Sequence, residues 1–271
     1  MTDQATKCRA LEARHQGSET FVIPNPWDAG SARLLQGLGF KALATTSSGF
    51  AFTQGLTDGA VTLQDKLDHC ARVARATDIP ISVDFEDGFA RSTKKMLENV
   101  ARLVETGVAG CSIEDYCRET KTLYEPGEAA DRVQAAAEYV RSLDMPFQLV
   151  ARAEVMLRAD APLETAIERL VAYEKAGAHV LFAPGLRTLE EIRAIRAAVE
   201  LPLNVLASFF RGVTLPQFAQ AGACRVSLGG TLTWALARPL VAASREMLEQ
   251  GTFDWMQSAL SGAEVRALLS K

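Results

Sequence analysis

The feature that most constrains the fold is an alternation, repeated eight times along the chain, of a short apolar run and a longer amphipathic segment. The runs have the composition of strands, and segments such as LETAIERLVAYEKA have a helical pattern. A glycine precedes four of the runs, where a left-handed C-cap would end a helix (Gly39, Gly107, Gly177 and Gly222). The eight runs are FVIPN (21–25), ALATTS (42–47), ISVDF (81–85), GCSIED (110–115), QLVARAE (148–154), HVLFAPG (179–185), PLNVLA (202–207) and CRVSLGG (224–230). This repeated unit predicts an α/β fold, a (β/α)8 TIM-type barrel.

The domain organisation follows from the same repeat. A doubly wound open sheet is the alternative fold, but it usually has fewer strands, and no GxGxxG follows the first run. With 271 residues, of which 48% are apolar, the chain can bury a large core. No Pro/Ser-rich linker divides it. We therefore predict a single barrel domain over residues 1–271, with residues 240–271 as a C-terminal helical tail.

Charge and composition exclude several classes of partner. A net charge of -4 and a pI near 5.6 argue against nucleic acid, which demands a basic surface. The uncharged stretch Val226–Ala237 is too short to span a bilayer, so no membrane partner is expected. The five scattered cysteines suit a reducing cytoplasm, which is the expected location.

Acidic residues stand where the third and fourth strands are expected to end. Because side chains alternate along a strand, Asp84 and Glu86 should point the same way. Glu114, at the end of the next strand, should approach them. Three carboxylates at one point repel each other unless a cation lies among them. Oxygen ligands without histidine or cysteine favour a hard divalent ion, Mg2+ first and Mn2+ next.

Other interpretations of these polar residues remain open. Acidic residues at strand ends can simply cap helices or pair with arginine, and Asp87 and Asp115 are the two that could serve only to hold loops. The segment Thr45–Gly59 offers hydroxyls and glycine amides to an anionic ligand, but an ordinary polar loop fits it equally well. Arg152, at the end of the fifth strand, could bind a substrate carboxylate through two hydrogen bonds.

Together these motifs resemble the isocitrate lyase/phosphoenolpyruvate mutase superfamily from about Phe21 to Leu240. The motifs that carry the resemblance are PNPWDAGSARLL, TTSSGF followed by Asp58, VDFEDGF, SIED and ARAE, in this order. The resemblance implies an Mg2+-dependent carbon–carbon lyase of this type, which forms the enolate of a 2-oxo acid. Members commonly assemble as tetramers whose pairs exchange C-terminal helices, so a homo-oligomer, tetramer or dimer, is expected. In this chain the tail could instead pack on its own barrel.

The resemblance also assigns roles residue by residue. The metal ligands would be Asp84, Glu86 and Glu114. Glu86 stands where an aspartate is more usual. The substrate-binding set would be Ser47, Ser48, Gly49, Phe50 and Arg152. The catalytic set would be Arg152, Asp58 and Glu114.

One loop departs from the family pattern. Isocitrate and methylisocitrate lyases carry a Lys-(Lys/Arg)-Cys-Gly-His loop after the fourth strand, whereas this chain reads DYCRETKTLYEPGEAADR. Cys117 lies too early in the loop to replace the family cysteine, and an inert thiol is the preferred interpretation. Lys121 lies near a lysine of the phosphonate-processing members. The sixth strand has Pro184 near the position of a glutamate in the lyases. Isocitrate lyase activity is therefore not predicted.

Three functions remain open. The first is an Mg2+-dependent lyase or decarboxylase acting on a small 2-hydroxy or 2-oxo (di)carboxylate and releasing a 2-oxo acid such as pyruvate. The second is a P–C bond enzyme of the phosphonopyruvate hydrolase or phosphoenolpyruvate mutase type, for which Lys121 or Arg118 would meet the phosphonate. The third is a barrel that binds a metabolite without catalysis. The intact acidic residues and Arg152 favour an enzyme.

Overall fold

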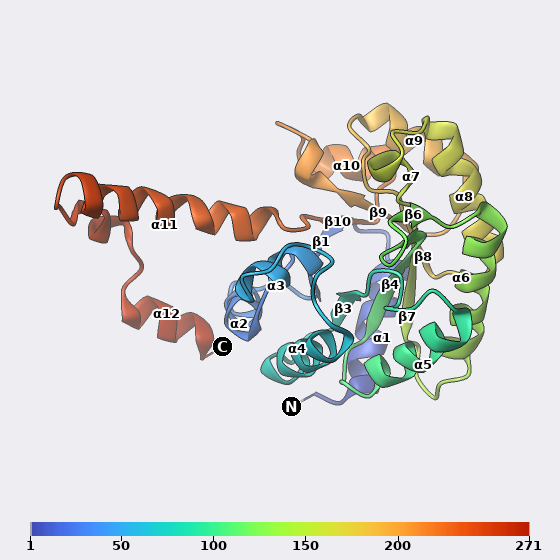
Figure 1. Cartoon of the computed structure of the whole chain (residues 1–271), viewed down its shortest axis with the longest axis horizontal. Helices are drawn as coiled ribbons and strands as arrows, with labels where there is room; N and C mark the ends of the chain where they lie inside the picture. The colour runs from blue at the N-terminus through green and yellow to red at the C-terminus, as the bar shows by residue number, and fades with distance from the viewer. Residues whose placement is uncertain (1, 271) are drawn as a thin grey trace.

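The computed structural model describes residues 2–270 and contains eight parallel strands in one curled sheet (Figure 1). The strand order is β1-β10-β9-β8-β7-β4-β3-β2, so each strand lies beside its neighbours in the chain. The backbone amide of Ala44 donates to the oxygen of Pro24 at 3.0 Å and joins the two ends of the sheet. The strands are β1 (Phe21–Val22), β2 (Leu43–Ala44), β3 (Ile81–Asp84), β4 (Gly110–Glu114), β7 (Gln148–Arg152), β8 (Val180–Phe182), β9 (Leu203–Leu206) and β10 (Arg225–Ser227). The predicted (β/α)8 TIM-type fold is confirmed.

The local signals in the sequence correspond to structure at each repeat. All eight strands lie inside the predicted runs, and each is shorter than its run. The glycines before four of them have positive φ angles of 105°, 88°, 93° and 98° at Gly39, Gly107, Gly177 and Gly222. A left-handed residue ends the preceding helix and lets the chain turn directly into the next strand. The repeat therefore positions every strand end at the same rim of the barrel.

Helices surround the sheet, and several begin at a capping side chain. The hydroxyls of Thr62, Ser92 and Thr188 each accept a hydrogen bond from an amide in the first turn of the following helix. The helices are α1 (Gln4–Gln16), α2 (Ala29–Gly37), α3 (Ser47–Thr53), α4 (Leu63–Ala76), α5 (Thr93–Val104), α6 (Pro126–Arg141), α7 (Val155–Arg158), α8 (Leu163–Lys175), α9 (Leu189–Ala198), α10 (Leu215–Ala221), α11 (Thr231–Glu249) and α12 (Gly262–Leu269), with 3-10 turns η1 (Ala207–Phe209) and η2 (Asp254–Ser258).

Helix α1 lies at the end of the barrel where the strands begin. Gln4 donates to the backbone oxygens of Val104 and Val108, just before β4. His15 pairs with Gln148, the first residue of β7, at 3.0 Å. Because α1 occupies this end, the opposite end, where the strands finish, is the one that remains for a ligand.

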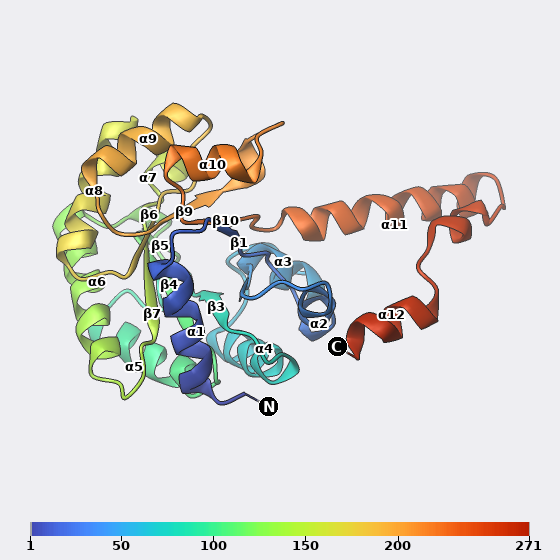
Figure 2. The same ribbon diagram turned by 180° about the vertical axis from the view of Figure 1, so that it is seen from behind.

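Helices α11 and α12 form an arm that extends away from the barrel (Figures 1 and 2). The arm then turns back, and Arg33 of α2 donates a hydrogen bond to the backbone oxygen of Leu269 in α12. Apolar side chains on α11 are exposed, including Leu240 at 64% and Leu248 at 87%. None of the helices in residues 2–270 is both long enough and apolar enough to cross a membrane.

Candidate active site

Two adjoining pockets lie at the carboxyl ends of the strands and share the residues Ser47, Asp58 and Arg152. The inner pocket, about 170 Å³, extends into the barrel past Asp84. The outer pocket, about 160 Å³, is lined by Glu86, Glu114 and residues of the loop after β4. The structure therefore brings the predicted acidic residues, Asp58 and Arg152 to one place.

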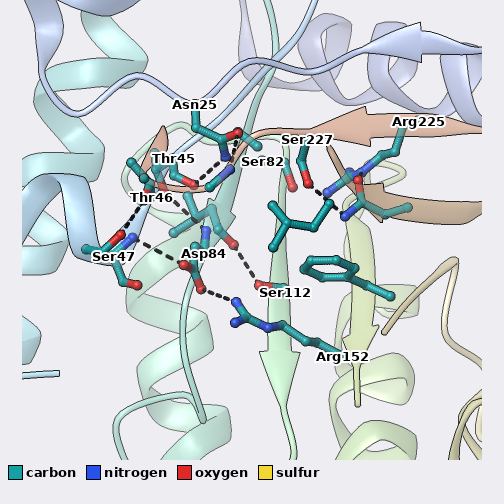
Figure 3. A pocket seen from close by; sticks show the side chains of 18 of the residues that line it. Asn25, Thr45, Thr46, Ser47, Ser82, Asp84, Ser112, Arg152, Arg225 and Ser227 are labelled. Carbon is teal, nitrogen blue, oxygen red and sulfur yellow. Dashed lines mark hydrogen bonds and ion pairs between the residues drawn. The ribbon is translucent and has the colours of Figure 1, made fainter. Parts of the chain in front are cut away.

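Arg152 is the centre of the acidic cluster. Asp84, Glu114 and Arg152 are the last residues of β3, β4 and β7. The Nη1 atom of Arg152 lies 3.3 Å from Asp84 (Figure 3) and 3.4 Å from Glu114. Its Nε atom donates to Glu154 at 2.5 Å. Arg152 therefore pairs with three carboxylates at once, those of Asp84, Glu114 and Glu154, and supplies positive charge from within the chain itself.

Glu86 does not follow the strand alternation from which its direction was predicted. Strand β3 ends at Asp84, and Glu86 has a φ of 49° in the turn beyond it. Its backbone oxygen accepts from the amide of Glu114 at 2.9 Å. Its carboxylate lies 3.5 Å from Nε of Arg118. Glu86 therefore reaches the cluster from a turn rather than from the strand.

The acidic groups differ in how readily they ionise. Burial raises the pKa of Glu114 well above its usual value, although Arg152 opposes this. Burial likewise raises the pKa of Glu86 to about 7, against the opposing charges of Lys66 and Arg118. At Asp84 burial is outweighed by Arg152, Lys66 and the Ser47 amide, and the pKa is lowered. Asp84 is thus the permanent anion of the cluster.

The pKa of Glu86 predicts how stability depends on pH. Because the folded protein holds this proton up to about pH 7 and the unfolded chain releases it near 4.5, stability should fall as pH rises between these values. At about 1.4 kcal/mol per pH unit, the loss from Glu86 is roughly 3 kcal/mol. Urea unfolding in EDTA at about pH 5 and about pH 8 should show this loss in the wild type and a smaller one in Glu86→Gln. An exposed-site variant, Glu98→Gln, should keep the wild-type slope, and an equal slope in Glu86→Gln would contradict the assignment.

The segment after β2 is a helix, not an open loop. Thr46 caps α3, accepting from the amide of Gly49 at 3.3 Å. Ser47 and Ser48 line the inner pocket. Phe50 is buried with its ring stacked on His69 at 3.9 Å, and neither Gly49 nor Phe50 is among the lining residues. The substrate-binding role of these two stays a prediction.

The loop after β4 contains a hairpin that the sequence did not reveal, β5 (Tyr116–Cys117) paired with β6 (Thr122–Leu123). Arg118 fastens it to the segment after α3, because its Nη2 atom donates to the backbone oxygens of Gly59 and Val61 at 2.7 Å. Lys121 lines the outer pocket. Cys117 is buried and lines neither pocket. Of these two residues, only Lys121 has access to the site.

Asp87 and Asp115 hold loops. Asp87 accepts from the amides of Phe89 and Arg118, both at 3.1 Å. Asp115 accepts from the Glu154 amide at 2.7 Å, from Arg169 at 2.9 Å and from the Tyr173 hydroxyl at 2.6 Å. Both carboxylates fix the turns that carry the pocket residues.

Two buried cations near the pockets were not anticipated. Lys66 of α4 is 1% exposed, its Nζ atom has no hydrogen-bond partner within residues 2–270, and its charge lowers the pKa of Asp84 and Glu86. Arg225 of β10 lines the inner pocket. A signal for Lys66 existed in the sequence, since it stands on the apolar face of α4 beside Leu67 and Cys70.

The donor set fits a hard divalent cation. Neither pocket is lined by histidine or cysteine, and the candidate ligands Asp84, Glu86 and Glu114 offer only oxygen. Their side chains do not form a ready-made metal cage anywhere in the described residues 2–270. Arg152 contacts two of the carboxylates and Arg118 faces the third, so the arginines occupy the positions nearest the oxygens.

Comparison with known proteins assigns the family. Residues 11–248 match the sequence model of phosphoenolpyruvate phosphomutase. The chain belongs to this family. The 2-methylisocitrate lyase of Escherichia coli is 32% identical over 204 residues, which cover 72% of this chain and 68% of that protein. An oxaloacetate decarboxylase of Rhodopseudomonas palustris is 29% identical over 265 residues, 94% of this chain and 89% of that protein.

Solved structures agree with this family membership. A crystal structure from Burkholderia cenocepacia, of a protein named only as a lyase/mutase, has a TM-score of 0.95 and 40% identity. The match covers 99% of this chain and 98% of that one. The resemblance to the isocitrate lyase/phosphoenolpyruvate mutase superfamily is confirmed, and this superfamily includes carbon–carbon lyases such as 2-methylisocitrate lyase.

Proposed function

We propose that this family member is an Mg2+-dependent lyase or decarboxylase of a small 2-hydroxy or 2-oxo dicarboxylate, and that it releases a 2-oxo acid such as pyruvate. The observation that carries the proposal is that Asp84 and Glu114 contact Arg152 at the ends of the strands, and that Glu86 lines the same outer pocket as Glu114 and Arg152. In barrels of this type chemistry takes place at that rim. Relatives that cleave carbon–carbon bonds or decarboxylate oxaloacetate support the reaction class.

The metal would be held by Asp84, Glu86 and Glu114, with Mn2+ as a substitute for Mg2+. When bound, the ion supplies Lewis-acid stabilisation of the negative charge that develops on the 2-oxo oxygen. The protein's own groups provide the rest. Arg152 adds a fixed positive charge, and the Ser47 and Ser48 side chains face the same pocket.

Cleavage leaves an electron pair on the carbon next to the 2-oxo group, and a proton must then be added there. The chain lacks the cysteine loop of the lyases, and Cys117 is buried away from the pockets. Water is therefore the proposed proton source. Asp58 lines both pockets, and we assign it the role of orienting that water.

A P–C bond enzyme is the second candidate, because of the cations around the outer pocket. Arg118, Lys121 and Arg158 line it beside Tyr116, and a phosphonate needs such charge. Arg118 and Arg158 already contact Glu86 and Glu154, at 3.5 and 3.0 Å. Lys121 forms no ion pair within residues 2–270. A phosphonate would thus depend chiefly on Lys121.

A substrate panel separates the candidates. NMR of the purified protein with Mg2+ should show a 2-oxo acid released from oxaloacetate, 2-methylisocitrate or dimethylmalate, and EDTA should abolish the release. If phosphonopyruvate is the only compound that reacts, and the Lys121→Met variant loses this activity, the second candidate is established instead. If no compound reacts while one raises the melting temperature, the protein is a metabolite-binding barrel.

We further propose that the chain forms a homo-oligomer through the arm. Exposed Leu240 and Leu248 lie two turns apart on one face of α11, with Leu236 and Met247 nearby. An apolar face of this kind usually marks an interface. Light scattering should give a mass at least twice 29.3 kDa. The double variant Leu240→Glu/Leu248→Glu should give a smaller species, whereas Glu249→Gln should not. A monomeric wild type would contradict the proposal.

A further inference from the structure

The wall of the inner pocket is unusually polar below the acidic cluster. The interior of a TIM barrel is normally filled by layers of branched apolar side chains. Here five polar residues from the strands line the pocket: Ser82, Ser112, Asn204, Arg225 and Ser227. Figure 3 shows Arg225 and Ser227 across the pocket from Thr46 and Ser47. The cavity thus continues into the barrel as a polar space.

Arg225 brings a positive charge to this space with no acid to balance it. It is 4% exposed. Arg152, the other arginine of the pocket wall, has three carboxylates within 3.4 Å, whereas Arg225 has none within 4.0 Å in residues 2–270. A buried charge without a counter-ion is costly, so an anion in contact with it would be stabilised.

The protein partners of Arg225 are neutral. Its Nε atom donates to Asn204 at 2.9 Å, and Nη1 lies 3.4 Å from Nε2 of His15. The other ring nitrogen of His15 pairs with Gln148 at 3.0 Å. Burial lowers the pKa of His15 to about 3, with the Arg225 charge adding to this, so the ring is neutral. Burial also lowers the pKa of Arg225, to about 10, and the guanidinium remains charged at neutral pH.

One donor group of Arg225 remains for a ligand. Within residues 2–270, no protein atom accepts a hydrogen bond from Nη2. Asn204 links Arg225 to Ser227, because its side-chain amide also donates to the Ser227 hydroxyl at 3.1 Å. A guanidinium with one free nitrogen can still donate a charge-assisted hydrogen bond to a carboxylate oxygen.

We propose that Arg225, with Ser82, Ser112 and Ser227, forms a seat for one carboxylate group inside the barrel, separate from the acidic cluster. The seat takes a single negative charge, because a second would face Asp84 across the same pocket. Its occupant is either a small monocarboxylate or one end of a dicarboxylate. The seat does not depend on the proposed reaction, since it can be tested without metal.

Calorimetry with formate tests the seat directly. The protein in EDTA should bind formate at one site, and Lys121→Gln, which removes one cation of the outer pocket, should bind it equally well. Arg225→Gln should bind formate at least about tenfold more weakly, the change expected when a charge-assisted hydrogen bond is lost. Equal affinity in Arg225→Gln, or no binding by the wild type, would overturn the proposal.

A second measurement avoids dependence on the variant's folding. Crystals of the wild-type protein grown with bromide should show anomalous density beside the guanidinium of Arg225, and no density there would overturn the proposal. A purely structural role for Arg225, tying β10 to β9 and α1, predicts no effect of formate on the melting temperature.

Succinate distinguishes the two occupants. Displacement of formate by succinate indicates one end of a dicarboxylate, and simultaneous binding indicates a separate small anion.

Discussion

Replacing Asp84 by asparagine is expected to lower kcat/KM for the best compound of the substrate panel by about three orders of magnitude. Asp84 is the acid of the cluster that stays ionised, since Arg152, Lys66 and the Ser47 amide lower its pKa in spite of burial. The amide keeps the shape of the side chain but removes the negative charge. That charge pairs with Arg152, 3.3 Å away, and would be a ligand of the proposed divalent ion.

The matched control is Asp68→Asn, on the exposed face of α4. It makes the same chemical change outside the pockets and should leave kcat/KM within about twofold of the wild type. Steady-state rates at saturating Mg2+ provide the comparison, with circular dichroism to verify folding. A kcat/KM of Asp84→Asn close to the wild-type value would mean that the acidic cluster is not catalytic.

Replacing Asp115 by alanine is expected to destabilise the protein by about 3–5 kcal/mol. Its carboxylate is buried and accepts hydrogen bonds from Arg169, Tyr173 and the backbone of Glu154. Without it the guanidinium of Arg169 stays buried with one remaining acceptor, the backbone oxygen of Tyr124. The free energy of unfolding, measured in urea, is the quantity to compare.

Tyr173→Phe serves as the control for this change. It removes one hydrogen bond to Asp115 and leaves the Arg169 ion pair, so a loss of about 1 kcal/mol is expected. If the two variants lost the same stability, the ion pair would contribute nothing beyond the hydroxyl contact. If Asp115→Ala were as stable as the wild type, Asp115 would not hold this loop.

The fold could be predicted because its signals are local. Each strand is a short apolar run, and glycines such as Gly177 and Gly222 end helices through their own φ angles. The β5–β6 hairpin was missed because two-residue strands are too short to produce a periodic pattern. The direction of the C-terminal helices was left open for a different reason: an amphipathic helix has the same pattern whether its apolar face meets its own barrel or another chain.

The site could be predicted only in part. Asp84, Glu114 and Arg152 are the last residues of strands, so parallel order alone places them at one rim. The turn at Glu86 was not predictable, because a positive φ in a residue other than glycine has no clear sequence signal. Arg225 was missed because the burial of its charge is decided by residues far away in the chain, whereas Lys66 was overlooked despite its place on the apolar face of α4.

Electron paramagnetic resonance of Mn2+ titrated into the protein tests whether the acidic cluster holds a divalent cation. Bound Mn2+ loses the sharp signal of the free ion. We expect the first equivalent per chain to give little free signal in the wild type, and Asp84→Asn to leave the ion free. If the signal of free Mn2+ rises in proportion to the Mn2+ added, from the first addition to the folded wild-type protein, the acidic cluster does not hold a divalent cation.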